Sequence, residues 1–305
     1  FVTKRYKNTS PEQIVEEVLT KKLQVQKKEM LGKGLPMSFL GSRKKPFDII
    51  KYVLTHGVSS DGKPDATEGS SKEGKTSGTT GFLCWETIDG YRFSSIDQLL
   101  KGEVGTRHTD YKKQLQNRSL DMKVAMKGIP AYEFTRIGDI QTKMRAGGFR
   151  NINVSLDMDT GEYVEYEYED ESNMTEKQKQ AVKKPTRIMC RTIANEKYNN
   201  ECNKAQPGTG DQSTKYLSQN AVRQNTFDDQ LGEFTFYPQF KMRAGDQVEV
   251  KIGKVKSEKD GGYDEKHSGN YVIKGIAHHF MMDGHAYTKV STIRSTTQQT
   301  DKETQ

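Results

Sequence analysis

Two stretches near the start of the chain space their apolar residues as amphipathic helices do. In the first, Ser10, Pro11 and Gln13 match a helix start, with a serine before the first turn, a proline at its first position and a glutamine that completes a capping box. The face expected to pack against a core consists of Ile14, Val15, Val18 and Leu19.

The second predicted helix covers residues 47–55 and follows a polar, irregular stretch at 24–45. Gly57, directly after His56, is expected to end this helix in the left-handed conformation that glycine adopts at little cost. The apolar residues of the helix are Phe47, Ile50, Val53 and Leu54.

Alternating and aromatic-rich runs further along predict strands. Residues 82–93 are typical of a hairpin that turns at Asp89-Gly90, and Ser94 with Asp97 is expected to cap a short helix after it. Residues 130–148 predict a strand and then a helix that ends at two glycines, whereas 102–130 is polar and gives no clear element.

Residues 151–169 predict two strands joined by a turn. In the second strand Glu165, Glu167 and Glu169 alternate with Val164, Tyr166 and Tyr168, so the three carboxylates share one face. Two interpretations stay open. The strand is half-buried with a solvated acidic face, or this acidic surface meets a basic partner or lines a channel.

The last third of the chain has the pattern of a compact β domain with one helix. A strand is predicted at 186–193 and a helix at 214–231. Four strands follow, at 234–240, 247–252, 270–280 and 286–293, with short connections except for a Lys/Gly-rich stretch at 254–269. Together with the first helices, this predicts an α+β fold.

Composition indicates a very polar protein in which the single chain forms only a small hydrophobic core. Of 305 residues, 32% are hydrophobic and 29% are charged, and the mean hydropathy is −0.88. Such a chain has modest cores and long solvated loops, or buries extra surface against partner subunits. No apolar run approaches the ~20 residues that cross a bilayer, so no stable membrane insertion is expected.

The net charge of +7 is not gathered into a nucleic-acid groove. Residues 157–176 carry nine carboxylates and no lysine or arginine, and the basic residues are scattered elsewhere. Sequence-specific nucleic-acid binding is therefore not expected. The three cysteines, Cys84, Cys190 and Cys202, lack the spacing of a metal or redox motif and favour free thiols in a reducing compartment.

One segment matches the phosphate-loop pattern G-x-x-x-x-G-K-[ST] letter for letter. GSSKEGKT at 69–76 lies in a low-complexity stretch, 58–81, expected to be an exposed and mobile loop. A phosphate loop needs a buried strand before it and a helix after it, and neither pattern is present. We interpret the match as accidental and expect no cofactor.

Three histidines, His278, His279 and His285, lie within eight residues. If Asp283-Gly284 is a two-residue turn, His278 pairs with Lys289 and lies about 13 Å along the ladder from His285, too far to share a metal. No paired carboxylates in an apolar setting and no nucleophile motif occur either, so we expect no metal site, no catalytic residues and no enzyme.

The order of these elements resembles the central baseplate hub proteins of contractile phage tails and related injection machines. The resemblance covers about 1–100 and 130–296 and is carried by the segments FDIIKYVLTHG, FLCWETIDGYRF, AYEFTRIGDIQTKMRAGGF and FKMRAGDQVEVKI. The closing strands match most specifically. Their matching positions are Gly245, Asp246 and Val248; Tyr271, Val272, Ile276, His278 and Phe280; and Tyr287, Thr288 and Arg294.

This resemblance implies an α+β chain with a tail-tube-like antiparallel β-barrel or sandwich domain, a flanking helix and a mixed α+β domain. It implies a homotrimer that joins the tail tube protein to the spike protein, contacts other baseplate (wedge) proteins and lets DNA pass without specific binding. The protein would be part of the virion baseplate and be assembled in the host cytoplasm. Glu165, Glu167 and Glu169 would then line the lumen or form a docking face.

The resemblance also gives expected boundaries. They are 1–10 as the last strand of a mostly absent N-terminal tube-like domain, 11–130 as a mixed hub domain, 131–185 as a strand–helix–hairpin segment with an acidic linker, 186–296 as the C-terminal tube-like β domain, and 297–305 as a disordered tail. The chain starts at Phe1, and we expect a trimmed polypeptide without a signal peptide. The alternatives are a tail-tip cell-wall hydrolase or surface-binding module and, remotely, a nucleotide-binding enzyme.

Overall fold

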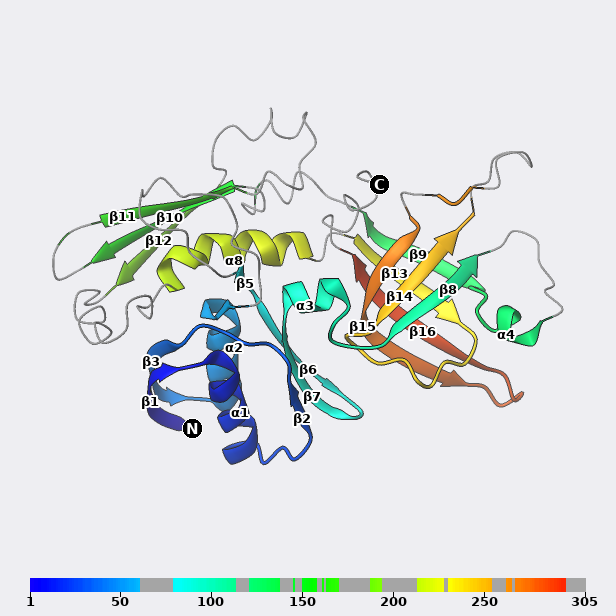
Figure 1. The fold of residues 1–305 in the computed structure, drawn as a ribbon, viewed down its shortest axis with the longest axis horizontal. Helices are drawn as coiled ribbons and strands as arrows, with labels where there is room; N and C mark the ends of the chain where they lie inside the picture. The colour runs from blue at the N-terminus through cyan, green and yellow to red at the C-terminus, as the bar shows by residue number, and fades with distance from the viewer. Residues whose placement is uncertain are drawn as a thin grey trace. The chain divides into compact units, whose positions relative to one another are not determined.

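The computed structural model contains two compact units, each made of two separate chain segments. One unit comprises Phe1–Gln98 and Ile140–Thr226, and the other comprises Leu99–Asp139 and Phe227–Gln305 (Figure 1). The described residues are 1–60, 79–113, 121–137, 145, 150–157, 161, 163–169, 187–193, 213–227, 230–253, 262–264 and 267–294. The fold is α+β, as the sequence predicted.

The first unit combines short sheets with helices. Its elements, with α3 running across the boundary, are β1 (Val2–Thr9), α1 (Pro11–Lys21), β2 (Lys28–Met30), β3 (Met37–Lys44), α2 (Pro46–His56), β4 (Val58–Ser59), β5 (Thr79–Thr80), β6 (Phe82–Thr87), β7 (Gly90–Ser95), α3 (Ile96–Lys101), β10 (Arg150–Asp157), β11 (Tyr163–Glu169), β12 (Arg187–Ile193) and α8 (Ser213–Phe227). Strand β1 pairs with β3, β4 with β5, β2–β7–β6 form one sheet, and β11–β10–β12 form another.

Helices α1 and α2 build the core of this unit, as their apolar spacing predicted. The Gln13 side chain accepts the Ser10 amide at 3.4 Å and so satisfies a helix-start donor. The core residues are Val2, Tyr6, Ile14, Val15, Val18, Leu19, Met37, Ile49, Ile50, Val53, Phe82 and Phe93. Phe47, predicted on the packed face of α2, is instead 55% exposed, because Ile49 and Ile50 take the inner positions.

Several local expectations were wrong by a residue or missed an element. The stretch 24–45 is not irregular, since β2 and β3 lie within it and Phe39 stacks on Tyr6 across the β1–β3 pair. The hairpin turns at Ile88-Asp89, because Thr87 pairs with Gly90. The residue that caps α3 is Ser95 rather than Ser94, since Ser95 Oγ accepts the Gln98 amide.

Gly57 does follow α2, but it does not take the left-handed conformation. Its φ of −69° and ψ of 143° are extended. A Cβ at this position would lie 2.7 Å from the Val53 carbonyl oxygen and 2.9 Å from the Phe82 ring. Close packing of the chain against the end of α2 therefore requires the glycine.

The second unit is a six-stranded sheet that curls into half a barrel (Figure 1). Its strand order is β8–β14–β15–β16–β13–β9, and only β8 and β14 run parallel. The elements are β8 (Arg107–Lys113), α4 (Met122–Ala125), β9 (Ala131–Ile137), β13 (Gln230–Phe236), β14 (Gln247–Ile252), β15 (Gly269–Phe280) and β16 (Ala286–Arg294). The core holds Tyr111, Ile129, Phe234, Phe236, Met242, Val248, Val250, Ile252, Tyr271, Ile273 and Val290.

Strand β13 begins earlier than its sequence pattern suggested. The predicted helix 214–231 ends at Phe227, and Leu231 lies in β13 opposite Ile293. The predicted helix within 138–148, apart from residue 145, the segments 170–185 and 297–305, and residues 61–78 of the predicted loop lie outside the described residues.

Candidate assembly surfaces

The sheet β11–β10–β12 has one face against α8. Asn151 Nδ2 donates to the Ser218 carbonyl oxygen at 3.1 Å, and the side chains of Asn151 and Asn153 are fully buried. Helix α8 lies beside this sheet in Figure 1. Since side chains alternate along a strand, the residues between these asparagines occupy the opposite face of the sheet.

That opposite face carries apolar residues together with the predicted carboxylates. Ile152 and Val154 are half-buried, Leu156 is 38% exposed, and Ile188, opposite Ile152 in register, is 64% exposed. Glu165 is exposed and pairs in register with Val154. We define the acidic sheet face by these five residues, with Glu167 and Glu169 at the next alternate positions of β11, opposite Ile152 and Arg150.

The three glutamates predicted as a site thus lie on one strand, where Glu165 and Glu167 are in register with the apolar residues of β10 and Glu169 is in register with Arg150. The described residues contain no group of three His, Cys, Asp or Glu that could hold a metal ion. Whether this face lines a lumen or docks on a partner stays a prediction.

A second surface, which the sequence analysis did not identify, lies at one end of the six-stranded sheet. The β15–β16 hairpin exposes Phe280, Met281 and Met282, and the last is fully solvated. Phe240, itself 53% exposed, stacks on Phe280 with ring centroids 5.8 Å apart. This end of the sheet therefore presents large apolar side chains to solvent.

The hairpin turn differs from the one expected. Phe280 pairs with Ala286, and the Met281 amide donates to the His285 carbonyl oxygen at 2.8 Å. His278 consequently lies opposite Thr288, not Lys289, and its Nδ1 is 3.0 Å from Thr288 Oγ1. A longer turn than Asp283-Gly284 alone shifts the register by one residue.

Helix α4 extends the exposed apolar surface. Met122, Val124 and Met126 on and just after this helix are 79%, 49% and 40% exposed. Gln239 Nε2 donates to the Met126 carbonyl oxygen at 3.3 Å, which ties α4 to the segment between Tyr237 and Phe240. The segment that includes Tyr237 and Phe240 therefore links α4, through Gln239, to the hairpin, through the stacking of Phe240 on Phe280.

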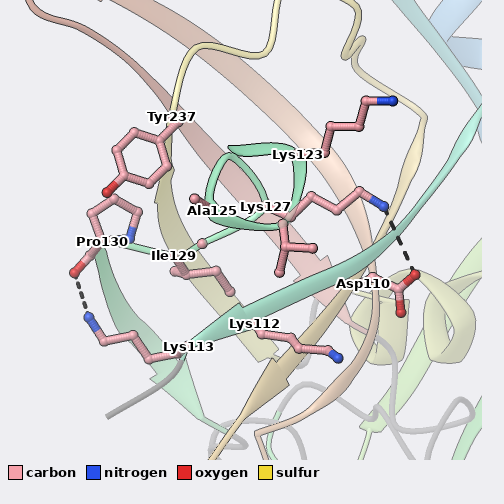
Figure 2. A pocket seen from close by; sticks show the side chains of 11 residues that line it. Asp110, Lys112, Lys113, Lys123, Ala125, Lys127, Ile129, Pro130 and Tyr237 are labelled. Carbon is pink, nitrogen blue, oxygen red and sulfur yellow. Dashed lines mark hydrogen bonds and ion pairs between the residues drawn. The ribbon is translucent and has the colours of Figure 1, made fainter. Parts of the chain in front are cut away.

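Lysines surround a hollow of about 550 Å³ beside α4 (Figure 2). Its lining includes Lys112, Lys113, Lys123, Lys127 and Tyr237, together with Asp110. Lys112, Lys123 and Lys127 extend toward the same side in Figure 2. The hollow is therefore a positively charged area next to the exposed apolar residues.

Ion pairs neutralise only part of this positive charge. Lys251 Nζ lies 3.3 Å and Lys127 Nζ 3.9 Å from the Asp110 carboxylate, and the hydrogen bond from Lys251 holds the pKa of Asp110 below its usual value. Lys113 Nζ donates to the Pro130 carbonyl oxygen at 2.5 Å. Within the described part of the chain, Lys112 and Lys123 have no ion pair.

We name this region the basic apolar end. It comprises Lys112, Lys123, Lys127, Met122, Val124, Met126, Tyr237, Phe240, Phe280, Met281 and Met282. Its residues come from four separate stretches of the chain, none of which has a distinctive sequence motif. Only the tertiary structure brings them together, so no local sequence pattern could reveal this surface.

The phosphate-loop match at 69–76 lies outside the described residues. Before it the nearest described strand is the two-residue β4, and after it β5 and β6 follow at 79–80 and 82–87. Strands therefore occupy the positions after residue 78, where a nucleotide-binding loop would continue into a helix.

Gly245 and Asp246, two of the positions that carry the sequence resemblance, lie in the turn before β14. Gly245 has a φ of 91°, and its amide donates to the Ile273 carbonyl oxygen at 2.8 Å. Asp246 follows as a buried residue, and β14 then begins at Gln247. Glycine is suited to this positive φ, because a Cβ disfavours it.

Cys84 is a free thiol in β6, and burial raises its pKa to about 11. No helix among the described residues is both long and apolar enough to cross a lipid bilayer.

No protein-family profile matches the chain, and no curated protein matches it. Solved structures do match. A tail protein from Neisseria meningitidis MC58 aligns with a TM-score of 0.50 at 9% identity, over 98% of this chain and 71% of the other. The 43 kDa tail protein of prophage MuSo2 from Shewanella oneidensis aligns at 0.48 and 11% identity, over 97% of this chain and 66% of the other.

A third match is an E. coli component of the type VI secretion system, described as structurally similar to the T4 tail proteins gp27 and gp5. It has a TM-score of 0.38 and 9% identity, over 95% of this chain and 50% of that protein. At these identities a likeness concerns the fold alone. This chain therefore shares its fold, along nearly its whole length, with the Neisseria tail protein.

Proposed function

We propose that this chain is a structural subunit of a contractile phage tail or a related injection machine, located at the baseplate hub between tube and spike. The observation that carries the proposal is the fold shared with a tail protein over 98% of the chain. The turn at Gly245-Asp246 and the β15–β16 hairpin support it, since both belong to the sequence pattern that resembles hub proteins.

The surface chemistry is consistent with assembly rather than catalysis. Large exposed apolar regions are uncommon on monomers and mark interaction surfaces. The basic apolar end has this character, with Phe280 and Met122 more than 70% exposed. In the proposed assembly three copies form the hub and contact the tail tube, spike and wedge proteins. DNA passes through without specific binding.

Native mass spectrometry of the full-length protein, with and without ATP, tests the proposal. A homotrimer without bound nucleotide is the expected result. A monomer that takes up ATP, and loses it in Lys75→Ala, would contradict the proposal and point to residues 69–76. Cleavage of purified cell wall by the protein would contradict it in favour of a hydrolase.

A further inference from the structure

Two exposed surfaces of the chain have opposite charge and a shared apolar character. The acidic sheet face presents Ile152, Val154, Leu156 and Ile188 beside the carboxylates of β11. The basic apolar end presents methionines and phenylalanines beside lysines. The two surfaces are therefore complementary in charge, and each exposes apolar area that a contact could bury.

We propose that the basic apolar end of one copy docks on the acidic sheet face of the next copy, so that the chain assembles head to tail. This inference rests on the proposed function, because it specifies which surfaces join the subunits. Burial of Phe280, Met281 and Leu156 supplies the hydrophobic stabilisation. The lysines opposite Glu165 set the orientation and exclude wrong pairings.

Charge favours this contact over a symmetric one. Two acidic faces would oppose carboxylates to carboxylates, and two basic ends would oppose Lys112 and Lys123 to the same lysines of the other copy. Complementary surfaces on different parts of the chain make a heterologous contact, which closes into a ring when the rotation between subunits allows it.

Features of the basic apolar end also favour a protein partner over a polyanion or a bilayer. Asp110 stays ionised in the lysine hollow, and Asp283 lies in the hairpin turn beside Met282. Negative charge at both places opposes phosphate groups. The apolar residues of a protein partner would not be repelled by these two carboxylates.

Charge reversal on each side tests the contact without disturbing known ion pairs. The basic variant is Lys112→Glu with Lys123→Glu, since neither lysine has an ion pair among the described residues. The acidic variant is Glu165→Lys with Glu167→Lys. The matched control is Lys274→Glu with Glu103→Lys, at exposed positions outside both surfaces. Circular dichroism checks that each variant of the full-length chain folds.

Sedimentation velocity over a concentration series then measures self-association. Each reversed variant is expected to associate at least tenfold more weakly than the unchanged protein, while the control associates normally. The variant that carries all four reversals is expected to regain the original assembly. An equimolar mixture of the basic and acidic variants is expected to associate more strongly than either variant alone, because unlike neighbours fit, but it should not form closed trimers, since three copies cannot alternate around a ring.

Other results would overturn the inference. Unchanged assembly of both reversed variants would mean that these surfaces do not form the contact. A different result would be that the variants expand to the same extent at every concentration, with no recovery when they are mixed. That result would mean that the two surfaces contact each other within one chain. Binding of phosphatidylglycerol vesicles that depends on Lys112 and Lys123, with assembly intact, would assign the basic apolar end to a membrane.

The failure of this inference is distinguishable from that of the proposed function. If self-association is unchanged by the charge reversals, the proposed docking surfaces are refuted but the hub proposal stays intact. An unchanged protein that stays monomeric at every concentration contradicts both.

Discussion

His108 on β8 and Asp246, the residue before β14, are in direct contact, with Nε2 and Oδ2 3.0 Å apart. The same carboxylate accepts the Thr106 amide at 3.1 Å and the Arg243 amide at 2.9 Å. Asp246 is almost fully buried. One aspartate therefore links the edge strand β8, which is distant in the sequence, to the turn that precedes β14.

Asp246→Ala is expected to lower the free energy of unfolding by about 1–3 kcal/mol, because it leaves two partly buried amide donors, those of Thr106 and Arg243, without their acceptor. Chemical denaturation monitored by circular dichroism measures the loss. Asp283→Ala is the control, since the Asp283 side chain is 62% exposed, and it should change stability by less than about 0.5 kcal/mol. Equal effects of the two substitutions would refute the role assigned to Asp246.

Gly90→Ala is expected to destabilise the first unit by about 1–3 kcal/mol. Gly90 has a φ of 130°, and an added Cβ would lie 2.4 Å from the Lys27 carbonyl oxygen. Gly275→Ala serves as control, because a Cβ there meets no atom within 4 Å. Thermal melts of the two variants compare the effects, and a melting temperature for Gly90→Ala that equals the control's would show that the backbone at Gly90 is not restrictive.

Glu17 is expected to stabilise the fold in a pH-dependent way. The hydrogen bond from Lys4, at 2.5 Å, lowers the pKa of Glu17 from its ordinary value of 4.5. A lowered carboxyl pKa contributes stability that is complete above about pH 4.5 and is lost as pH falls through the folded-state pKa.

Glu17→Gln should therefore cost up to about 1 kcal/mol at pH 7, as expected for a partly exposed pair. The difference from the unchanged protein should shrink once the pH falls below 4.5. Urea denaturation at a series of pH values measures it. A difference that stays constant from neutral to acid pH would show that the charge of Glu17 is not the cause.

Cys84 is expected to react slowly with thiol reagents in the folded protein. Because burial raises its pKa from 9.0 to about 11, the reactive thiolate at pH 8 is about 100-fold scarcer than for an ordinary cysteine. Iodoacetamide labelling followed by peptide mass spectrometry measures this rate against the urea-unfolded chain. Equally fast labelling in both states would contradict the burial of Cys84.

Local patterns in the sequence predicted the elements better than their registers. The capping residues at Ser10 and Gln13 and the hairpin around Asp89 were recognisable, because capping and turn chemistry act within a few residues. Registers at Gly90 and His278 were wrong by one residue, since turn length depends on how the strands pack. Strand β3 was missed because its partner, β1, is distant in the sequence, with Tyr6 paired to Phe39.

The same distinction applies to the candidate surfaces. The acidic alternation at Glu165 is local and was visible in the sequence. The basic apolar end was not, because Lys123, Tyr237 and Phe280 come together only after the six-stranded sheet forms. Surfaces assembled from distant segments leave no periodic signal in any one of them.

The sheet of the second unit has a consequence for synthesis on the ribosome. Its two outer strands, β8 and β9, are made before residue 140, whereas the four strands between them come after residue 229. Strands β8 and β9 keep unpaired edges until residues 230–294, which form the four strands between them, have been synthesised. Completion of the carboxyl-terminal hairpin therefore acts as the closing step of folding, and an incomplete chain leaves exposed strand edges that invite aggregation.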